Sequence, residues 1–305
     1  MTTLDGPWAL RHIAANGARF RVAEVGAGPL VLFLHGFPEF WWAWRHQLPA
    51  VAAAGFHAVA MDLRGYGGSD KTPRGYDPVT LAADVAGVIR TLGARNAVVV
   101  GQGWGGYVGW AVAAGQPTCV GGLVAISAPH PLEMLRSSQL LRRAPLVHVA
   151  AMQLPWMPER RIMASDYVAR HLAAWSARDS RFPSAAETAE YRAALGEWPS
   201  PHCALEYHRW LVRSRFRSDG RAFAAMMRSR IGVPVLQLRG QADVVVSPRA
   251  VSRSARYVDG PHTAIDLGSA GHFPHEEQPE AVTRTLLDWL AAPSGGAVAG
   301  GDRLA

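Results

Sequence analysis

The chain has 305 residues, of which 49% are hydrophobic and 18% charged, which is the composition of a globular protein large enough to bury a full core. Disordered and fibrous classes are excluded, because disordered chains combine low hydrophobicity with high net charge. The two cysteines, Cys119 and Cys203, are too few for a disulfide framework, so we expect buried free thiols and a cytoplasmic location. Neither a signal peptide nor an apolar run of about 18 residues is recognisable, so we expect no export and no membrane span.

The net charge of +7 comes from one segment of the chain. Residues 131–230 hold 16 arginines and nine acidic residues, whereas the remainder is balanced. We interpret this surplus as a solvated face, with an anionic substrate or an acidic surface as the alternative. Nucleic-acid binding is not needed to explain the charge, so we expect no nucleic-acid partner.

The first predicted element is a β-hairpin, because Asn16-Gly17 stands between two alternating segments. Short β-branched and leucine-rich runs follow and predict strands. They cover 29–36, 57–65, 96–103, 120–129, 234–240 and 262–271. Helical patterns such as 79–93 lie between several of them. Strands that alternate with helices predict an α/β fold with a mostly parallel, doubly wound sheet.

The alternation stops near Pro131 and resumes at Pro234, and the residues between them are rich in arginine and tryptophan and broken by prolines. This pattern predicts three parts of the chain. They are a core of residues 1–130 and 231–291, an inserted helical lid of residues 131–230, and a flexible glycine-rich tail of residues 292–305.

The stretch VVVGQGWGGYVGW (98–110) has the features of a nucleophile elbow, in which small residues flank a sharp turn between a strand and a helix. Gly101, Gly105 and Gly106 occupy the small positions, and Trp104 follows the nucleophile. The nucleophile position is therefore Gly103, which has no side chain.

Other candidate site residues follow further predicted strands. The backbone N–H of Phe37, after the strand 29–36, and that of Trp104 are positioned to form a two-donor oxyanion hole. Asp243 follows the strand 234–240, and His272 follows the last strand. The order elbow, acid, histidine makes Asp243 and His272 a candidate catalytic dyad.

Together these motifs resemble the epoxide hydrolase and haloalkane dehalogenase branch of the α/β-hydrolase superfamily, and the epoxide hydrolases most. The resemblance covers residues from about 18 to 291 and rests on HGFP, DLRGYGGSD, the GxxWGG elbow, SAPHP, RGQAD and GHFPHEE. In that family an elbow Asp attacks the epoxide and forms an ester, which water activated by the histidine hydrolyses. The resemblance implies that Asp243 is the orienting acid and His272 the base, and we expect neither a metal nor a cofactor.

Two features depart from the family pattern. Where such enzymes read GHDWGG, this chain reads GQGWGG, so Gly103 cannot form an ester. The family also uses two lid tyrosines as donors to the epoxide oxygen. The correspondence places the first at Ala151 and the second at His208, with Tyr207 beside it. Adjacent helical residues point about 100° apart, so Tyr207 and His208 cannot both face the cleft.

We therefore expect an epoxide-hydrolase-like hydrolase that acts on a small, largely apolar molecule with water activated by His272 and Asp243. A second hypothesis is a non-catalytic ligand-binding or regulatory protein, a pseudoenzyme that keeps the pocket. A third is that Ser127, at a neighbouring strand end, attacks instead. We expect aromatic residues to line the pocket, namely Phe37, Phe40, Trp41, Trp42 and Trp104. The oligomeric state is left open.

Overall fold

A computed structural model describes residues 4–134, 136 and 143–292 and places their strands in one eight-stranded sheet of order β1-β2-β4-β3-β5-β6-β7-β8. The strands are β1 (Ala9–Ala15), β2 (Ala18–Val25), β3 (Leu30–Leu34), β4 (His57–Met61), β5 (Ala97–Gln102), β6 (Val120–Ile126), β7 (Val235–Gly240) and β8 (His262–Leu267). Apart from residue 292, the predicted tail lies outside the described residues.

The predicted hairpin joins β1 to β2 and is confirmed. The two strands pair antiparallel, with Ala15 opposite Ala18. Asn16 and Gly17 form the turn with φ of 45° and 73°, the left-handed conformation that a tight hairpin turn requires and that Asn-Gly tolerates.

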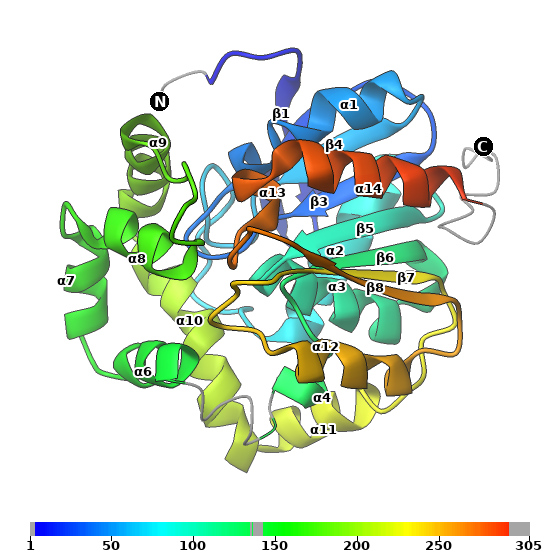
Figure 1. Cartoon of the computed structure of the whole chain (residues 1–305). Helices are drawn as coiled ribbons and strands as arrows, with labels where there is room; N and C mark the ends of the chain where they lie inside the picture. Colours follow the sequence, from blue (N-terminus) through cyan, green and yellow to red (C-terminus); the bar gives the residue numbers. More distant parts are fainter. Residues whose placement is uncertain (1–3, 135, 137–142, 293–305) are drawn as a thin grey trace.

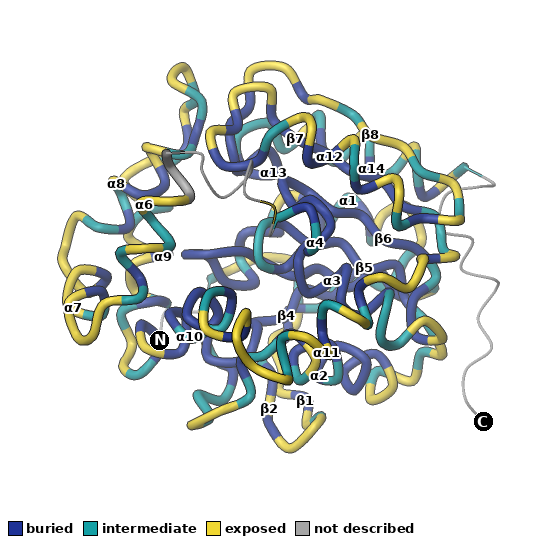
Figure 2. The backbone as a smooth tube through the Cα atoms, turned by 90° about the horizontal axis from the view of Figure 1, so that it is seen from below, coloured by how far each residue is buried: buried dark blue, intermediate teal, exposed yellow. Residues whose placement is uncertain are grey.

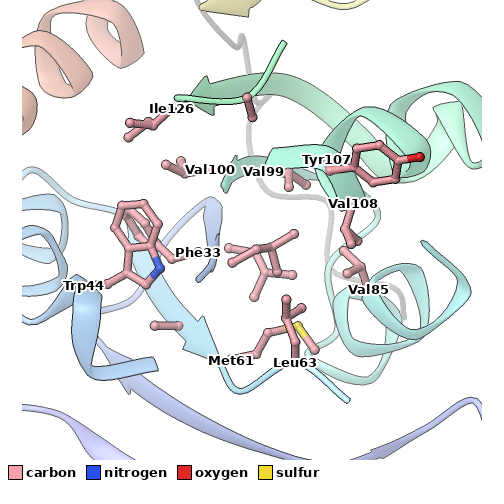
Figure 3. Packing of buried hydrophobic residues seen from close by; sticks show 14 of the residues in the cluster. Phe33, Trp44, Met61, Leu63, Val85, Val99, Val100, Tyr107, Val108 and Ile126 are labelled. Atoms are coloured by element: carbon pink, nitrogen blue, oxygen red, sulfur yellow. The ribbon is translucent and has the colours of Figure 1, made fainter. Parts of the chain in front are cut away.

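The remaining strands form the parallel part of the sheet, in which β3 to β8 pair only with parallel neighbours, apart from β4 with β2. Every residue of β3 and β5 is buried, as expected for strands covered on both faces. Figure 3 shows Val99 and Val100 packing toward opposite sides, Val100 toward Phe33 and Trp44 and Val99 toward Val108. The predicted doubly wound, mostly parallel sheet is confirmed.

Helices cover both faces of the sheet. The helices α1 (Gln47–Ala53) and α14 (Pro279–Ala291) pack together on one face, and α2 (Pro78–Thr91) and α3 (Trp104–Gly115) on the other (Figure 1). Short helices occur at α12 (Pro248–Ser254), α13 (Pro274–Glu277), η1 (Trp41–Trp44), η2 (Pro117–Cys119), η3 (Ser214–Phe216) and η4 (Ala255–Tyr257). Within the described residues no helix combines the length and apolar character needed to cross a membrane. Both cysteines are buried and free.

Residues 131–230, here called the inserted segment, lie between β6 and β7. Their described residues form helices and the turns between them, and no strand. These helices are α4 (Pro131–Met134), α6 (Arg143–Ala151), α7 (Met157–Met163), α8 (Tyr167–Trp175), α9 (Ala185–Gly196), α10 (Ser200–Arg213) and α11 (Ser218–Met226). Helices α6 to α10 gather at one end of the sheet (Figure 1). The tube view shows the central strands buried and the outer part of α7 exposed (Figure 2).

Arg45, next to η1, ties the inserted segment to the sheet. Its guanidinium lies 2.6 Å from Glu187 of α9 and 2.6 Å from Glu276 of α13. Tyr191 of α9 donates its hydroxyl to the same Glu276, and the guanidinium also lies 3.9 Å from the centre of the Trp42 ring. One largely buried cation therefore neutralises carboxylates from both parts of the chain.

Candidate active site

Gly103 forms the sharp turn between β5 and α3, with φ of 51° and ψ of −114°. Its N–H donates to the Ile126 carbonyl at 3.0 Å, and its carbonyl accepts from the Tyr107 N–H at 2.9 Å. A Cβ atom on Gly105 would meet the Leu34 carbonyl oxygen at 2.1 Å, so a glycine is needed there to let α3 approach β3. The backbone of a nucleophile elbow is thus present in full.

The position where a nucleophile would stand is open. A Cβ atom on Gly103 would lie 3.6 Å from His272 Nε2 and 3.8 Å from the Gly36 Cα, which are ordinary van der Waals distances. The cavity at this point, lined by Gly103, Ser127 and His272 among others, has a volume of about 50 Å³. A cavity that encloses about one water-sized sphere, roughly 10–15 Å³, already holds a water, so this cavity has room for water.

His272 and Asp243 lie together at this cavity. His272 Nδ1 is 3.1 Å from one carboxylate oxygen of Asp243 and 3.2 Å from the other. Asp243 also accepts from the backbone N–H groups of Val245 and Val246 at 2.7 and 2.9 Å. Burial alone would raise the pKa of Asp243, but His272 and these N–H groups lower it, so the carboxylate is ionised. An ionised carboxylate only accepts, so Nδ1 carries the proton and Nε2, facing Gly103, is free to accept one.

Backbone contacts hold His272 in place. Its N–H donates to the Trp175 carbonyl at 2.8 Å, and its carbonyl accepts from the Gln102 side chain at 2.8 Å. Gln102 thus links the end of β5 to the loop that carries the histidine. The sequence analysis assigned no role to Gln102, although it lies next to the elbow glycine.

Phe37 and Trp104 both line the cavity, and the backbone N–H of neither donates to any residue that the structure describes. The loop before Phe37 is fixed by His35, whose Nδ1 donates to the Gly36 carbonyl at 2.8 Å. His35 Nε2 accepts from the Leu63 N–H at 3.0 Å. Two residues whose backbone N–H groups have no described acceptor therefore line the cavity, on the two turns where the sequence predicts an oxyanion hole.

His208 of α10 faces the cavity as a hydrogen-bond acceptor. Its Nδ1 lies 3.0 Å from the Ala204 carbonyl, and since a carbonyl only accepts, Nδ1 carries the proton. Burial lowers the pKa of His208 to about 4, so the ring is neutral and Nε2 holds a lone pair. Trp104 Nε1 donates to that atom at 3.0 Å. His208 therefore has no free proton to give to a substrate.

The donor at this wall is His148 of α6, which the sequence analysis missed. His148 Nε2 lies 3.0 Å from His208 Nε2, and since His208 Nε2 is unprotonated, the favourable tautomer of His148 carries its proton on Nε2 and shares the His208 lone pair with the Trp104 N–H. The side chain is half-buried and lines the cavity, and burial lowers its pKa, so it is neutral. The family correspondence gave the first lid position as Ala151, one helical turn further on, which has no side-chain donor. Two histidines within the predicted helical insertion, His148 and His171, were the available signal.

Tyr207 lies outside the cavity. Its hydroxyl donates to the Arg64 carbonyl at 2.7 Å, and its ring packs against Trp104 with centroids 5.8 Å apart. The structure contradicts the prediction that Tyr207 is a lid donor. The physical reason is the one given from helix geometry, because His208 takes the direction toward the cavity and its neighbour points away.

Ser127 also lines the cavity, at the end of β6. Its backbone has φ of 48°, an uncommon conformation for a residue with a side chain, and its N–H donates to the Leu238 carbonyl at 2.8 Å. The buried hydroxyl has no hydrogen-bond partner among the described residues. It is therefore available to a water or a substrate atom in the cavity.

A second, larger pocket of about 910 Å³ lies among α6, α7 and α8 and shares His148 and Trp175 with the small cavity. The Trp175 ring is 4.9 Å from the His148 ring and 5.1 Å from the His272 ring, centroid to centroid. These rings form a wall between the two spaces.

The expected aromatic lining holds only in part. Phe37 and Trp104 line the cavity. Phe40 and Trp42 instead pack on Tyr191, and Trp41 packs on Trp8. These three side chains help to bind the inserted segment and the N-terminal region to the core, and the prediction that they line the pocket is wrong.

Among the described residues, one group of side chains could hold a metal ion. The possible ligand atoms of His46, Glu187 and Glu276 lie within 4.8 Å of one another. Arg45 already neutralises both carboxylates at 2.6 Å. The cluster is explained by that ion pair and needs no cation.

The fold and the site define a class, the α/β hydrolases. A family model described as the alpha/beta hydrolase fold matches residues 29–279, and the chain belongs to this family. It is 32% identical over 291 residues to the AB hydrolase superfamily protein YfhM of Bacillus subtilis, across 92% of this chain and 97% of that protein.

Other relatives are epoxide hydrolases. The chain is 30% identical over 310 residues to epoxide hydrolase A of Mycobacterium tuberculosis, across 92% of this chain and 96% of that protein. Its structure resembles that of epoxide hydrolase A from Mycobacterium thermoresistibile with a TM-score of 0.80 and 26% identity, across 92% and 97% of the two chains. These similarities support the hydrolase class and the epoxide hydrolase branch of the family.

Proposed function

We propose that this protein is an epoxide-hydrolase-like hydrolase in which water, and not a side chain, attacks the substrate, with the inserted segment acting as the lid. One observation carries the proposal. The vacant position at Gly103 lies 3.6 Å from His272 Nε2, measured from the place of a Cβ atom, and the cavity has room for water. A base thus faces a water-sized space where a nucleophile would stand.

The reaction follows from the hydrogen-bond roles of the side chains. Water beside Gly103 gives a proton to His272 Nε2 while its oxygen bonds to an epoxide carbon, and the bond from that carbon to the ring oxygen breaks. Asp243 stabilises the imidazolium that forms. The N–H groups of Phe37 and Trp104 hold the water oxygen as it becomes hydroxide-like, and the negative charge ends on the ring oxygen as its bond to carbon breaks.

The leaving oxygen needs a donor on the opposite side. His148 turns its Nε2–H from His208 to this oxygen, which then takes up a proton from solvent as His272 releases its own. The net change is the addition of one water to give a diol. Serine hydrolases without their nucleophile keep only about 10³–10⁴-fold acceleration over water, and we expect a rate enhancement of that order.

The absence of a side chain at Gly103 favours one second candidate, a ligand-binding protein without turnover. A pure binder has no use for an ionised Asp243 that holds His272 in the tautomer of a base. The dyad therefore favours the hydrolase.

Oxygen labelling tests the proposal. A single turnover of styrene oxide in H₂¹⁸O should give a diol that carries ¹⁸O from the first turnover, because no protein oxygen enters the product. His272→Ala should abolish the reaction, whereas His12→Ala, which changes an exposed ring on β1, should leave it unchanged. Unlabelled oxygen in the first diol would reject water as the nucleophile. No His272-dependent turnover of any epoxide would favour the binding protein.

A further inference from the structure

Arginines gather on two helical surfaces that lie outside the candidate active site. On one of them, Arg221 of α11 and Arg228 just after this helix are both exposed. On the other, Arg249, Arg253 and Arg256 recur along α12 and η4 at intervals of four and three residues. Side chains at these intervals lie on the same side of a helix. The three guanidinium groups of α12 and η4 therefore point in one direction.

The two surfaces are neighbours in the fold. Figures 1 and 2, seen from different directions, both place α4 between α11 and α12. The chain after α11 is joined to η4, because Arg230 donates to the Val258 carbonyl at 3.1 Å and Ile231 pairs with Val258 in a β-bridge. The five arginines of the two surfaces are here called the basic face. They are Arg221, Arg228, Arg249, Arg253 and Arg256.

The charge of the basic face is not balanced by nearby acidic residues. The acids on and beside these helices already pair with other arginines. These pairs are Asp219 with Arg217 at 2.8 Å, Asp259 with Arg230 at 2.5 Å and Glu133 with Arg136 at 3.6 Å. The side chains of the basic face make no hydrogen bond or ion pair with any described residue. Five positive charges are therefore left for an external anion.

The guanidinium groups lie close enough to repel one another. Desolvation lowers the pKa of Arg253, and the neighbouring charges of Arg249 and Arg136 lower it further. An anionic surface that approached α12 would remove this repulsion. The charge thus favours a partner that presents several anionic groups.

One large apolar side chain stands beside the basic face. Phe216 of η3 comes just before α11 and is 87% exposed, more than any other large apolar side chain that the structure describes. Arg215 and Arg217 flank it in the sequence. A protruding ring gains free energy from a partner with an accessible apolar interior, which a lipid bilayer has and a nucleic-acid duplex lacks. Basic and aromatic side chains together are typical of proteins that lie on anionic membranes.

We infer that the basic face and Phe216 form a docking surface for the anionic headgroups of a membrane. The arginines bind headgroup phosphates, and the Phe216 ring enters the boundary between headgroups and acyl chains. The protein then lies on the bilayer without crossing it. Docking does not depend on the proposed reaction, because no residue of the docking surface lines the cavity beside Gly103.

Binding of the full chain to lipid vesicles tests the inference. We expect binding to vesicles of phosphatidylglycerol and phosphatidylcholine in equal amounts, and none to phosphatidylcholine alone. Raising the ionic strength from about 0.05 M to about 0.5 M should release the protein, because salt screens the attraction. Arg249→Gln combined with Arg256→Gln should weaken binding about thirtyfold, at about fivefold for each arginine. Phe216→Ser should weaken it about tenfold and leave its dependence on salt unchanged.

Two control variants change similar residues elsewhere. Arg192→Gln combined with Arg284→Gln removes the same charge from exposed positions on α9 and α14, which lie toward the top of Figure 1, whereas α11 lies at the bottom. Trp156→Ser removes a ring that is 77% exposed, just before α7. Both controls should bind vesicles as the wild type does. The substituted side chains are exposed, so thermal unfolding should show that every variant folds.

Four results would overturn the inference. Absence of binding to the anionic vesicles at low salt would reject it outright. Equal effects of the two arginine pairs would reduce the attraction to the net charge of the chain. Loss of binding with Trp156→Ser but not with Phe216→Ser would move the contact to α7. Binding to duplex DNA with the same arginine dependence, and no effect of Phe216→Ser on vesicle binding, would replace the membrane by a general polyanion.

The same measurement on His272→Ala separates docking from the proposed function. This variant should bind vesicles as the wild type does, because His272 is not part of the docking surface. Loss of hydrolysis with vesicle binding retained would reject only the proposed function, and loss of vesicle binding in an active enzyme would reject only the docking surface.

Discussion

Gly103 has φ of 51°, the backbone conformation of a nucleophile elbow, although it has no side chain for the turn to position. An L-residue in a left-handed conformation is disfavoured by about 1–2 kcal/mol, so glycine relieves a strain that a nucleophile at this point would have to bear. The turn persists because its neighbours fix it, through the Ile126 carbonyl and the close contact of Gly105 with β3. The conformation and the side chain are thus separable properties of the elbow.

Gly103→Asp should therefore fold and gain covalent chemistry. We expect a loss of about 1–2 kcal/mol in the free energy of unfolding, from the left-handed backbone alone. A carboxylate at this position points toward His272, so epoxide turnover should rise and an ester on Asp at position 103 should be trapped by mass spectrometry. The first diol formed in H₂¹⁸O should then carry unlabelled oxygen from the protein.

Two alanine variants control for the backbone. Gly103→Ala should be tolerated with a similar loss of stability and no ester, whereas Gly105→Ala should disrupt folding because its Cβ meets the Leu34 carbonyl at 2.1 Å. If the wild type is measurably active and Gly103→Asp is less active, the prediction is wrong. The reaction then needs the vacant space for water, and an Asp at position 103 does not form the ester.

The residues of the dyad and the elbow were predictable because each follows a recognisable strand and belongs to a short motif. His148 was not, since no motif fixes the register of α6, and the family correspondence pointed to Ala151, one turn away. The contact of His148 with His208 joins helices 60 positions apart. Such contacts depend on how helices pack, and helix periodicity in the sequence does not contain that information.

At the scale of single elements, α6, α8 and α10 carry neutral histidines into the wall of the site. Burial lowers the pKa of His208 to about 4 and that of His171 to about 3. Above about pH 6.5 these rings are neutral in both the folded and the unfolded chain. Below it the unfolded chain takes up protons that the folded chain excludes, so acid lowers stability.

We expect the free energy of unfolding to fall as the pH falls from about 6.5 toward 4, by up to about 1.4 kcal/mol per pH unit for each such histidine. His171→Phe should make this slope shallower, because the ring stays between Tyr167 and Trp175 and its buried Nε2 has no described partner to lose. Urea unfolding between pH 5 and 7 measures the slope. His12→Phe is the exposed control, and an unchanged slope in the His171 variant would contradict the burial argument.

The strands were predictable from sequence to within a few residues, because β-branched runs buried on both faces leave few alternatives. The attachment of the inserted segment was not. Arg45 contacts Glu187 across 142 positions and Glu276 across 231. Charged residues in the sequence read as solvated surface until the chain is folded, and so the largely buried position of Arg45 was not foreseen.

Considered as a whole, the molecule depends on Arg45 to hold the inserted segment against the core. Arg45→Met should destabilise the protein by about 3–5 kcal/mol, because it leaves the buried Glu276 without its cation. Arg217→Met is the matched control, since its pair with Asp219 is exposed and screened by solvent, so its loss should leave stability nearly unchanged.

Limited proteolysis shows which part of the chain loses stability in the Arg45→Met variant. In the Arg45 variant we expect trypsin to cut first within residues 131–230, which are rich in arginine, and earlier than in the wild type. First cleavage at Arg95, just before β5, or at Arg239 in β7 would show that the inserted segment does not open as a unit.

The open elbow also has a genetic consequence. Glycine codons GGC and GGT become aspartate codons GAC and GAT by a change of the second base alone. Because the backbone turn, the base and the space for a side chain are already in place, one base change in a GGC or GGT codon is enough to replace attack by water with attack by a carboxylate. Cultures selected for survival on a toxic epoxide are therefore expected to recover Asp at position 103 among the first gain-of-function alleles.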